Sequence, residues 1–246
     1  MPEVVILLLA ACGTALATGL GAVPVFLLGT RAAALTPTLL GFAAGVMAVA
    51  AVAGLLIPAT QEGSAAEVIG GLAVGIAFLA LVRWRFHPDA SFMGRTGPGT
   101  RTSALVFLVL FVHSLPEGFA VGTAFASDRA GLSLFVILAI AIQNIPEGTS
   151  VAIPMEEAGF SHARQFWAAV ATSAPQPVGA LIAFFAVEAI GGLLPFSFAF
   201  AAGAMLALIV VEMLPEAYSG PGRAGPSAGI VAGAALMLVL SLLLGV

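Results

Sequence analysis

Two short runs inside apolar segments carry the residue types best suited to chemistry. They extend from His113 to Gly118 and from Gln143 to Gly148, and both end in Pro-Glu-Gly. Each run lies about halfway along its apolar segment. An ionisable group at membrane depth costs several kcal/mol unless it faces a cavity, a partner or an ion. The glutamates of the two runs, Glu117 and Glu147, therefore indicate a functional site.

The spacing within each run predicts which side chains act together. His113 and Glu117 are four residues apart, as are Gln143 and Glu147, so on a helix each pair lies on one face. If the two faces meet, they supply an imidazole, two carboxylates and an amide oxygen. This set of ligands suits Zn²⁺, and could also hold Cd²⁺, Fe²⁺, Mn²⁺ or Co²⁺.

A proline precedes each of these glutamates and predicts local distortion of the helix. Pro116 and Pro146 cannot donate a backbone hydrogen bond to the carbonyl four residues earlier. Each helix is therefore expected to kink and to release a carbonyl beside the site. Irregular backbone at membrane depth is tolerated where it lines a cavity.

The composition indicates a membrane protein. Of the 246 residues, 8% are charged and 61% are hydrophobic, whereas soluble domains carry about 25% charged residues. The net charge of −4 is spread thinly and implies no nucleic-acid partner. A membrane span needs about 20 apolar residues, which predicts an all-α fold with eight transmembrane helices in a single domain, 1–246. The expected spans are 4–29, 38–61, 65–85, 103–126, 131–155, 163–190, 193–216 and 226–246, with one longer cytoplasmic loop at 86–102.

Arginine distribution and an internal similarity predict the topology. Seven of the eight arginines fall in odd-numbered connectors, and Arg129 alone falls in an even-numbered one. Because cytoplasmic loops are enriched in basic residues, the odd connectors are expected in the cytoplasm and both termini outside. Residues 42–47 (FAAGVM) and 200–205 (FAAGAM) are similar, yet their spans would run in opposite directions. Such a pair is typical of an inverted-repeat transporter.

The paired Pro-Glu-Gly runs resemble the motifs of helices four and five in the ZIP (Zrt/Irt-like protein) metal transporters. Resemblance to a prokaryotic member implies a 3+2+3 arrangement, with helices 4 and 5 between two inverted three-helix halves. It also implies inward transport of Zn²⁺ by alternating access in a bacterial inner membrane, with Cd²⁺, Fe²⁺ and Mn²⁺ as alternative substrates. The partners implied are the metal ion and the lipid bilayer. No organic cofactor is expected, and a homodimer is left open.

Carried over by position, the resemblance assigns a primary metal site to His113, Glu117, Gln143 and Glu147. A second site of binuclear relatives would map to Ser114, Asn144 and Gln176, together with the two shared glutamates. Here Ser114 stands where asparagine is usual, and Gln176 stands where many members have glutamate. Both changes remove ligand strength, so the second site is expected to be weak or lost. The resemblance also places Glu212 on the exit route to the cytoplasm.

Two other classes of protein are alternatives to a transporter of metal ions. The alternative is an enzyme, an intramembrane zinc metallohydrolase, which could draw three ligands from His113, Glu117 and Glu147 and activate a water at the fourth position. Against it, the sequence has no His-Glu-x-x-His run. The second alternative is a cation channel or a proton-coupled carrier of an organic substrate. No basic residue is expected at mid-membrane to pair with an organic anion, which counts against the carrier. The protein is therefore expected not to be an enzyme.

Overall fold

The computed structural model describes residues 2–85, 91–96, 98–127 and 129–246. Almost all of this part is helical, and one two-residue strand pair, β1 with β2, joins α5 to α6. The elements in chain order are α1 (Pro2–Leu20), α2 (Val23–Leu28), the 3-10 helix η1 (Gly29–Leu35), α3 (Thr36–Val49), the π-helix η2 (Ala50–Leu56), α4 (Ile57–Glu62), α5 (Ala65–Arg85), β1 (Ser91–Phe92), β2 (Arg95–Thr96), α6 (Pro98–Ala126), α7 (Ala130–Glu157), α8 (His162–Thr172), α9 (Pro175–Ala189), α10 (Leu194–Leu208), the π-helix η3 (Ile209–Met213), α11 (Leu214–Ala217) and α12 (Ala224–Leu244).

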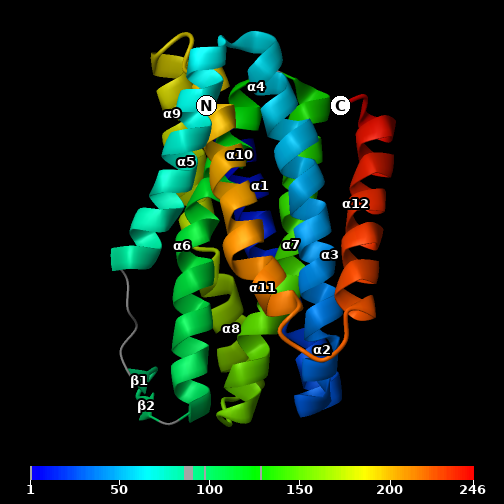
Figure 1. The fold of residues 1–246 in the computed structure, drawn as a ribbon. Helices are drawn as coiled ribbons and strands as arrows, with labels where there is room; N and C mark the ends of the chain where they lie inside the picture. Colours follow the sequence, from blue (N-terminus) through cyan, green and yellow to red (C-terminus); the bar gives the residue numbers. More distant parts are fainter. Residues whose placement is uncertain (1, 86–90, 97, 128) are drawn as a thin grey trace.

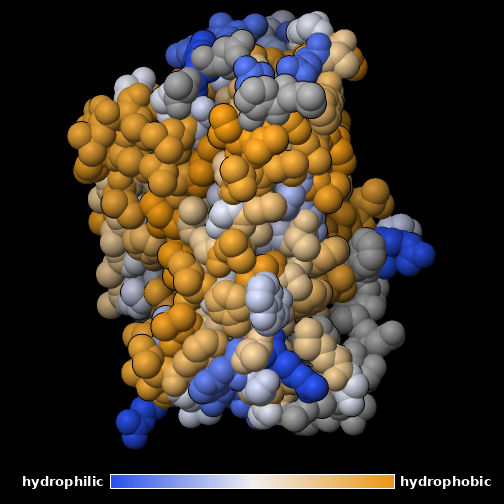
Figure 2. All heavy atoms as spheres, turned by 180° about the vertical axis from the view of Figure 1, so that it is seen from behind, coloured by the Kyte–Doolittle hydropathy of each residue, from blue (hydrophilic) through white to orange (hydrophobic). Residues whose placement is uncertain are grey.

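The long helices lie side by side in one bundle (Figure 1). Within the described residues, seven helical stretches are long and apolar enough to cross a membrane. The first stretch, Glu3–Glu62, covers the first two predicted spans and contains α1 and α3. Both chain ends lie at the upper end of the bundle in Figure 1, the end that also carries α4. Figure 2 shows an outer face that is mostly apolar between polar residues at its two ends, as a membrane protein requires.

Four closely packed helix pairs build the bundle: α3 with α12, α5 with α10, α6 with α9, and α1 with α7. In each pair a glycine lies directly against the backbone of the partner helix, which is the small-residue packing common in membranes. These contacts are Gly45 on Ile230, Gly75 on Phe200, Gly118 on Gln176 and Gly148 on Thr18.

Several boundaries differ from those predicted, and prolines explain some of them. Helix α6 begins at Pro98, inside the predicted loop 86–102, because proline is favourable in the first helical turn. The described part of that loop is correspondingly short, and residues 86–90 and 97 lie outside the described residues. The sixth predicted span is broken between α8 and α9, immediately before Pro175. By contrast, α6 and α7 remain helical through Pro116 and Pro146.

Candidate metal site

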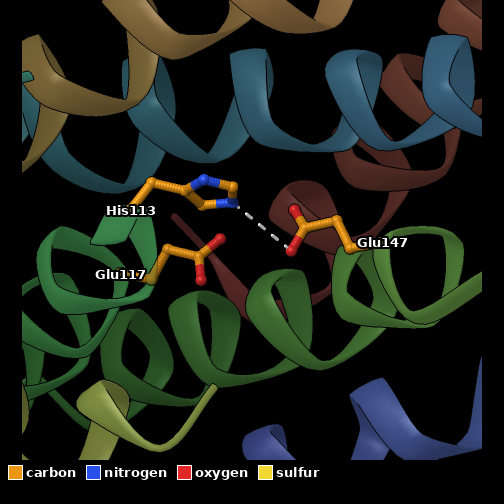
Figure 3. A group of neighbouring side chains, drawn as sticks. All are labelled: His113, Glu117 and Glu147. Atoms are coloured by element: carbon orange, nitrogen blue, oxygen red, sulfur yellow. Dashed lines mark ion pairs between the residues drawn. The ribbon is translucent and has the colours of Figure 1, made fainter. Parts of the chain in front are cut away.

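Three ionisable side chains from α6 and α7 meet in the middle of the bundle (Figure 3). They are His113 and Glu117 of α6 and Glu147 of α7. One potential ligand atom of each lies within 4.8 Å of the others, and all three residues are at most 4% exposed. No other group of three potential His, Cys, Asp or Glu ligands is found in the described part of the chain. The four-residue spacing and the pairing of the two helices thus bring the predicted side chains together.

His113 and Glu147 have buried polar atoms without hydrogen-bond partners, and these atoms fit the binding of a cation. The Nε2 atom of His113 lies 3.7 Å from Oε2 of Glu147, which is too long for a hydrogen bond. Among the described residues, neither ring nitrogen of His113 nor Oε1 of Glu147 has a hydrogen-bond partner. Buried polar atoms are normally paired, so each of these needs an explanation. A divalent cation between the two side chains would satisfy them.

Glu117 is held differently, because two amides donate to it. Gln143 Nε2 donates to Glu117 Oε1 at 2.6 Å, and Gln176 Nε2 donates to Glu117 Oε2 at 2.8 Å. The amide oxygen of Gln143 is buried and lacks a hydrogen-bond partner within the described chain. Gln143 therefore holds the carboxylate of Glu117 and leaves its own amide oxygen without a hydrogen-bond partner among the described residues.

The residues predicted for a second site form a hydrogen-bonded network. Asn144 and Gln176 are fully buried and bond to each other, with Asn144 Nδ2 3.3 Å from Gln176 Oε1 and Gln176 Nε2 3.4 Å from Asn144 Oδ1. Ser114 is buried but donates to the carbonyl of Leu110 on its own helix, at 2.9 Å. Gln176 thus directs an amide nitrogen, which is a hydrogen-bond donor, at the carboxylate of Glu117.

Sequence reasoning missed Thr14 of α1, which completes this network. Its hydroxyl lies 2.8 Å from Gln176 Oε1, and its carbonyl accepts from Asn144 Nδ2 at 2.7 Å. Thr18, one turn further along, shares a hydrogen bond of 2.6 Å with Ser173. Two hydroxyls four residues apart in an otherwise apolar span were the available signal, since they mark one polar face.

The glycine of each Pro-Glu-Gly run sets the spacing between helices at the site. A Cβ atom on Gly118 would overlap the backbone of Gln176 in α9, and one on Gly148 would overlap the carbonyl of Thr18 in α1. Each glutamate is thus followed by a residue that lets its helix lie against α9 or α1. The motif therefore combines a ligand with the contact that positions it.

A cavity of about 460 Å³ leads from the site toward the end of the bundle that carries α11. His113 and Glu147 line its inner wall, and Glu212 and Glu216 line it further along. Glu212 lies in the π-helix η3. Glu212 therefore lines the same cavity as His113 and Glu147.

Comparison with known proteins gives consistent matches. The family model described as ZIP Zinc transporter matches residues 95–241, which include both Pro-Glu-Gly runs. The chain is 35% identical to the zinc transporter GufA of Myxococcus xanthus, over 93% of this chain and 95% of the relative. It is 32% identical to the zinc transporter ZIPB of Bordetella bronchiseptica, over 93% of this chain and 78% of the relative. A putative zinc transporter of Arabidopsis thaliana is 36% identical over 93% of this chain, which spans only 36% of that longer relative.

Proposed function

The chain belongs to the ZIP zinc transporter family, and on this premise we propose that it carries Zn²⁺ into the cytoplasm through the site formed by His113, Glu117 and Glu147. It is an integral membrane protein that transports divalent metal ions. Membership of a transporter family argues against the alternative, an intramembrane metallohydrolase.

The unsatisfied atoms of His113 and Glu147 carry the assignment of the site. An imidazole, two carboxylates and the amide oxygen of Gln143 offer four nitrogen and oxygen ligands, which Zn²⁺ accepts in a tetrahedral arrangement. The same ligands accept Cd²⁺, Fe²⁺ and Mn²⁺, so these ions are expected to compete. Zn²⁺ would bind at this site as the transported substrate and would then be released from it.

We further propose eight membrane crossings in a 3+2+3 arrangement, with both termini outside. The first helical stretch, of 60 residues, is long enough for two crossings, one through α1 and one through α3, η2 and α4, and the other six stretches bring the total to eight. The close helix pairs agree with an inverted repeat in which the first three spans correspond to the last three and α6 corresponds to α7. Under this correspondence the pair α5 with α10 becomes the pair α12 with α3, and the pair α6 with α9 becomes the pair α7 with α1. The π-helices η2 and η3 also fall in corresponding spans, a few residues after the similar segments 42–47 and 200–205. The relatives in bacteria support a bacterial inner membrane.

The transport mechanism we propose is alternating access, with this conformation open to the cytoplasm. The 460 Å³ cavity leads to the arginine-rich end of the bundle, where Glu212 offers Zn²⁺ an intermediate contact on its way out. On the other side of the site, α7 packs against η2 through buried apolar residues, among them Ala51, Leu55, Phe135 and Val136.

Zinc uptake by proteoliposomes tests this function. The purified protein should give saturable uptake of Zn²⁺ that Cd²⁺ reduces by competition, whereas an open pore would not saturate. Uptake should fall as the outside pH is lowered, because protons compete with the metal for the imidazole and carboxylates. Hydrolysis of a lipid or peptide without zinc flux would contradict the proposal.

We also propose that this chain binds one metal ion where binuclear relatives bind two. Gln176 would replace the second ion by donating an amide hydrogen bond to Glu117, while its oxygen is held by Thr14 and Asn144. Ser114 and Asn144 then contribute to this polar network instead of acting as strong ligands.

Exchange of Gln176 for glutamate should restore a second site. Gln176→Glu replaces the donated hydrogen bond by a carboxylate beside Glu117, and two adjacent carboxylates require a proton or a cation between them. Zinc titration by calorimetry should then rise from one ion per chain to two. Gln165→Glu is the matched control, because Gln165 is likewise buried and donates to Glu156 at 2.6 Å but lies outside the group of metal ligands. One ion in both variants would refute the proposal.

A further inference from the structure

One ion pair links the outer ends of α4 and α7. Arg129 directly precedes α7, and its guanidinium pairs with the carboxylate of Glu62, the last residue of α4. The Glu62 side chain is 24% exposed and that of Arg129 is 46% exposed. No transport step described above uses this pair.

The two partners belong to different groups of helices. One group contains the close pairs α1 with α7 and α6 with α9, and the other contains α3 with α12 and α5 with α10. The metal site lies in the first group, and the 460 Å³ cavity lies between the two groups at the cytoplasmic end. At the outer end the groups are in contact, because Gly54 of η2 lies against the Phe135 ring and Gly131 lies against the backbone of Leu244. The Glu62–Arg129 pair closes the same boundary at its outermost edge.

Arg129 also lines an outer cavity with two glutamates of its own group. The cavity has a volume of about 580 Å³, and the two glutamates are Glu3 of α1 and Glu188 of α9. If the two helix groups part at the outer end, Glu62 moves away with α4, while Glu3 and Glu188 stay with Arg129. The arginine therefore has a partner across the boundary when the outside is closed and acidic partners on its own side when the outside is open.

We propose that Arg129 is an outer latch that exchanges its partner during transport. Its pairing with Glu62 stabilises the state closed to the outside, and its pairing with Glu3 and Glu188 stabilises the state open to the outside. This inference rests on the proposed alternating access. Because both partners are partly exposed, each pairing contributes modestly, and loss of one is expected to change the ratio of the two states about two- to fivefold.

Thiol labelling in both directions tests the latch. The exposed Cys12 is first replaced by serine, and a reporter cysteine is placed at Ala51, buried at the outer boundary, or at Ser150, which lines the cytoplasmic cavity. In metal-free proteoliposomes, Glu62→Gln should raise labelling of the Ala51 reporter two- to fivefold and lower that of the Ser150 reporter. The combined replacement of Glu3 and Glu188 by glutamine should have the opposite effect, with lower labelling of the Ala51 reporter and higher labelling of the Ser150 reporter.

Glu67→Gln is the matched control, because this outer glutamate accepts hydrogen bonds only from Ser64 among the described residues and is expected to leave labelling unchanged. Opposite shifts at the two reporters distinguish a change of conformation from partial unfolding, which would expose both. The latch would be overturned if Glu62→Gln left the labelling of both reporters unchanged. It would also be overturned if Glu62→Gln and the combined replacement of Glu3 and Glu188 changed the labelling of a given reporter in the same direction. If zinc uptake by the parent protein persists in that case, the proposed function stands without it.

Discussion

Replacement of Glu147 by alanine should abolish zinc transport. The side chain supplies one of two carboxylates within reach of His113, and truncation leaves a buried site without one of its charged ligands. Changes to residues that merely support a metal ligand cost about 10- to 100-fold in affinity or activity, so loss of the ligand itself should lower the zinc uptake rate at least about 100-fold. Uptake of ⁶⁵Zn²⁺ into proteoliposomes measures the loss, with protein orientation and amount matched to the parent.

The matched control for this variant is Glu157→Ala, which removes a carboxylate from an exposed position at the C-terminal end of α7. It should retain most of the parent uptake rate. Glu147→Gln adds a second comparison, since it keeps the volume of the side chain and removes only its charge. A Glu147→Ala protein that moves zinc at the parent rate would show that the ion takes another path.

Replacement of Gly148 by alanine should destabilise the fold around the site. The added methyl group would overlap the carbonyl oxygen of Thr18, so α1 and α7 would have to move apart. Overpacking of this kind costs about 1–3 kcal/mol in the free energy of unfolding. The shift of α7 would also displace Glu147, the preceding residue. We expect a lower thermal unfolding midpoint in detergent together with loss of zinc uptake.

Gly13→Ala is the control for this second variant, because a Cβ atom at Gly13 of α1 meets no heavy atom within 4 Å. Alanine is favoured over glycine inside a helix by up to about 1 kcal/mol, so this protein should be as stable as the parent or slightly more so. Equal midpoints for the Gly148 and Gly13 variants would show that α1 and α7 do not need this close contact.

The meeting of the primary ligands could be predicted because it depends on helical periodicity. His113 and Glu117 on one face, opposite Glu147, follow from spacing and from the cost of burying a charge. The spacing also identified Gln143, and the resemblance to the family identified Gln176, although neither could show that both side chains donate to Glu117. That detail depends on rotamers and on the approach of α9, which apolar patterns do not encode.

Features that depend on contacts between helices were missed for the same reason. Thr14 has a role only because α1 lies beside α7 and α9, which brings its hydroxyl to Gln176. The close packing of Gly118 against α9 and of Gly148 against α1 became clear only from the structure. Helix ends were also displaced where a proline could serve as a first-turn residue, as at Pro98.

The position of bound zinc tests the central claim most directly. Crystals of the parent protein grown with Zn²⁺ should give, at the zinc absorption edge, one anomalous peak between α6 and α7. The peak should lie about 2.0–2.2 Å from a nitrogen of His113 and from carboxylate oxygens of Glu117 and Glu147, as expected for zinc coordination. A zinc peak elsewhere in the bundle, with none between His113 and Glu147, would contradict the account.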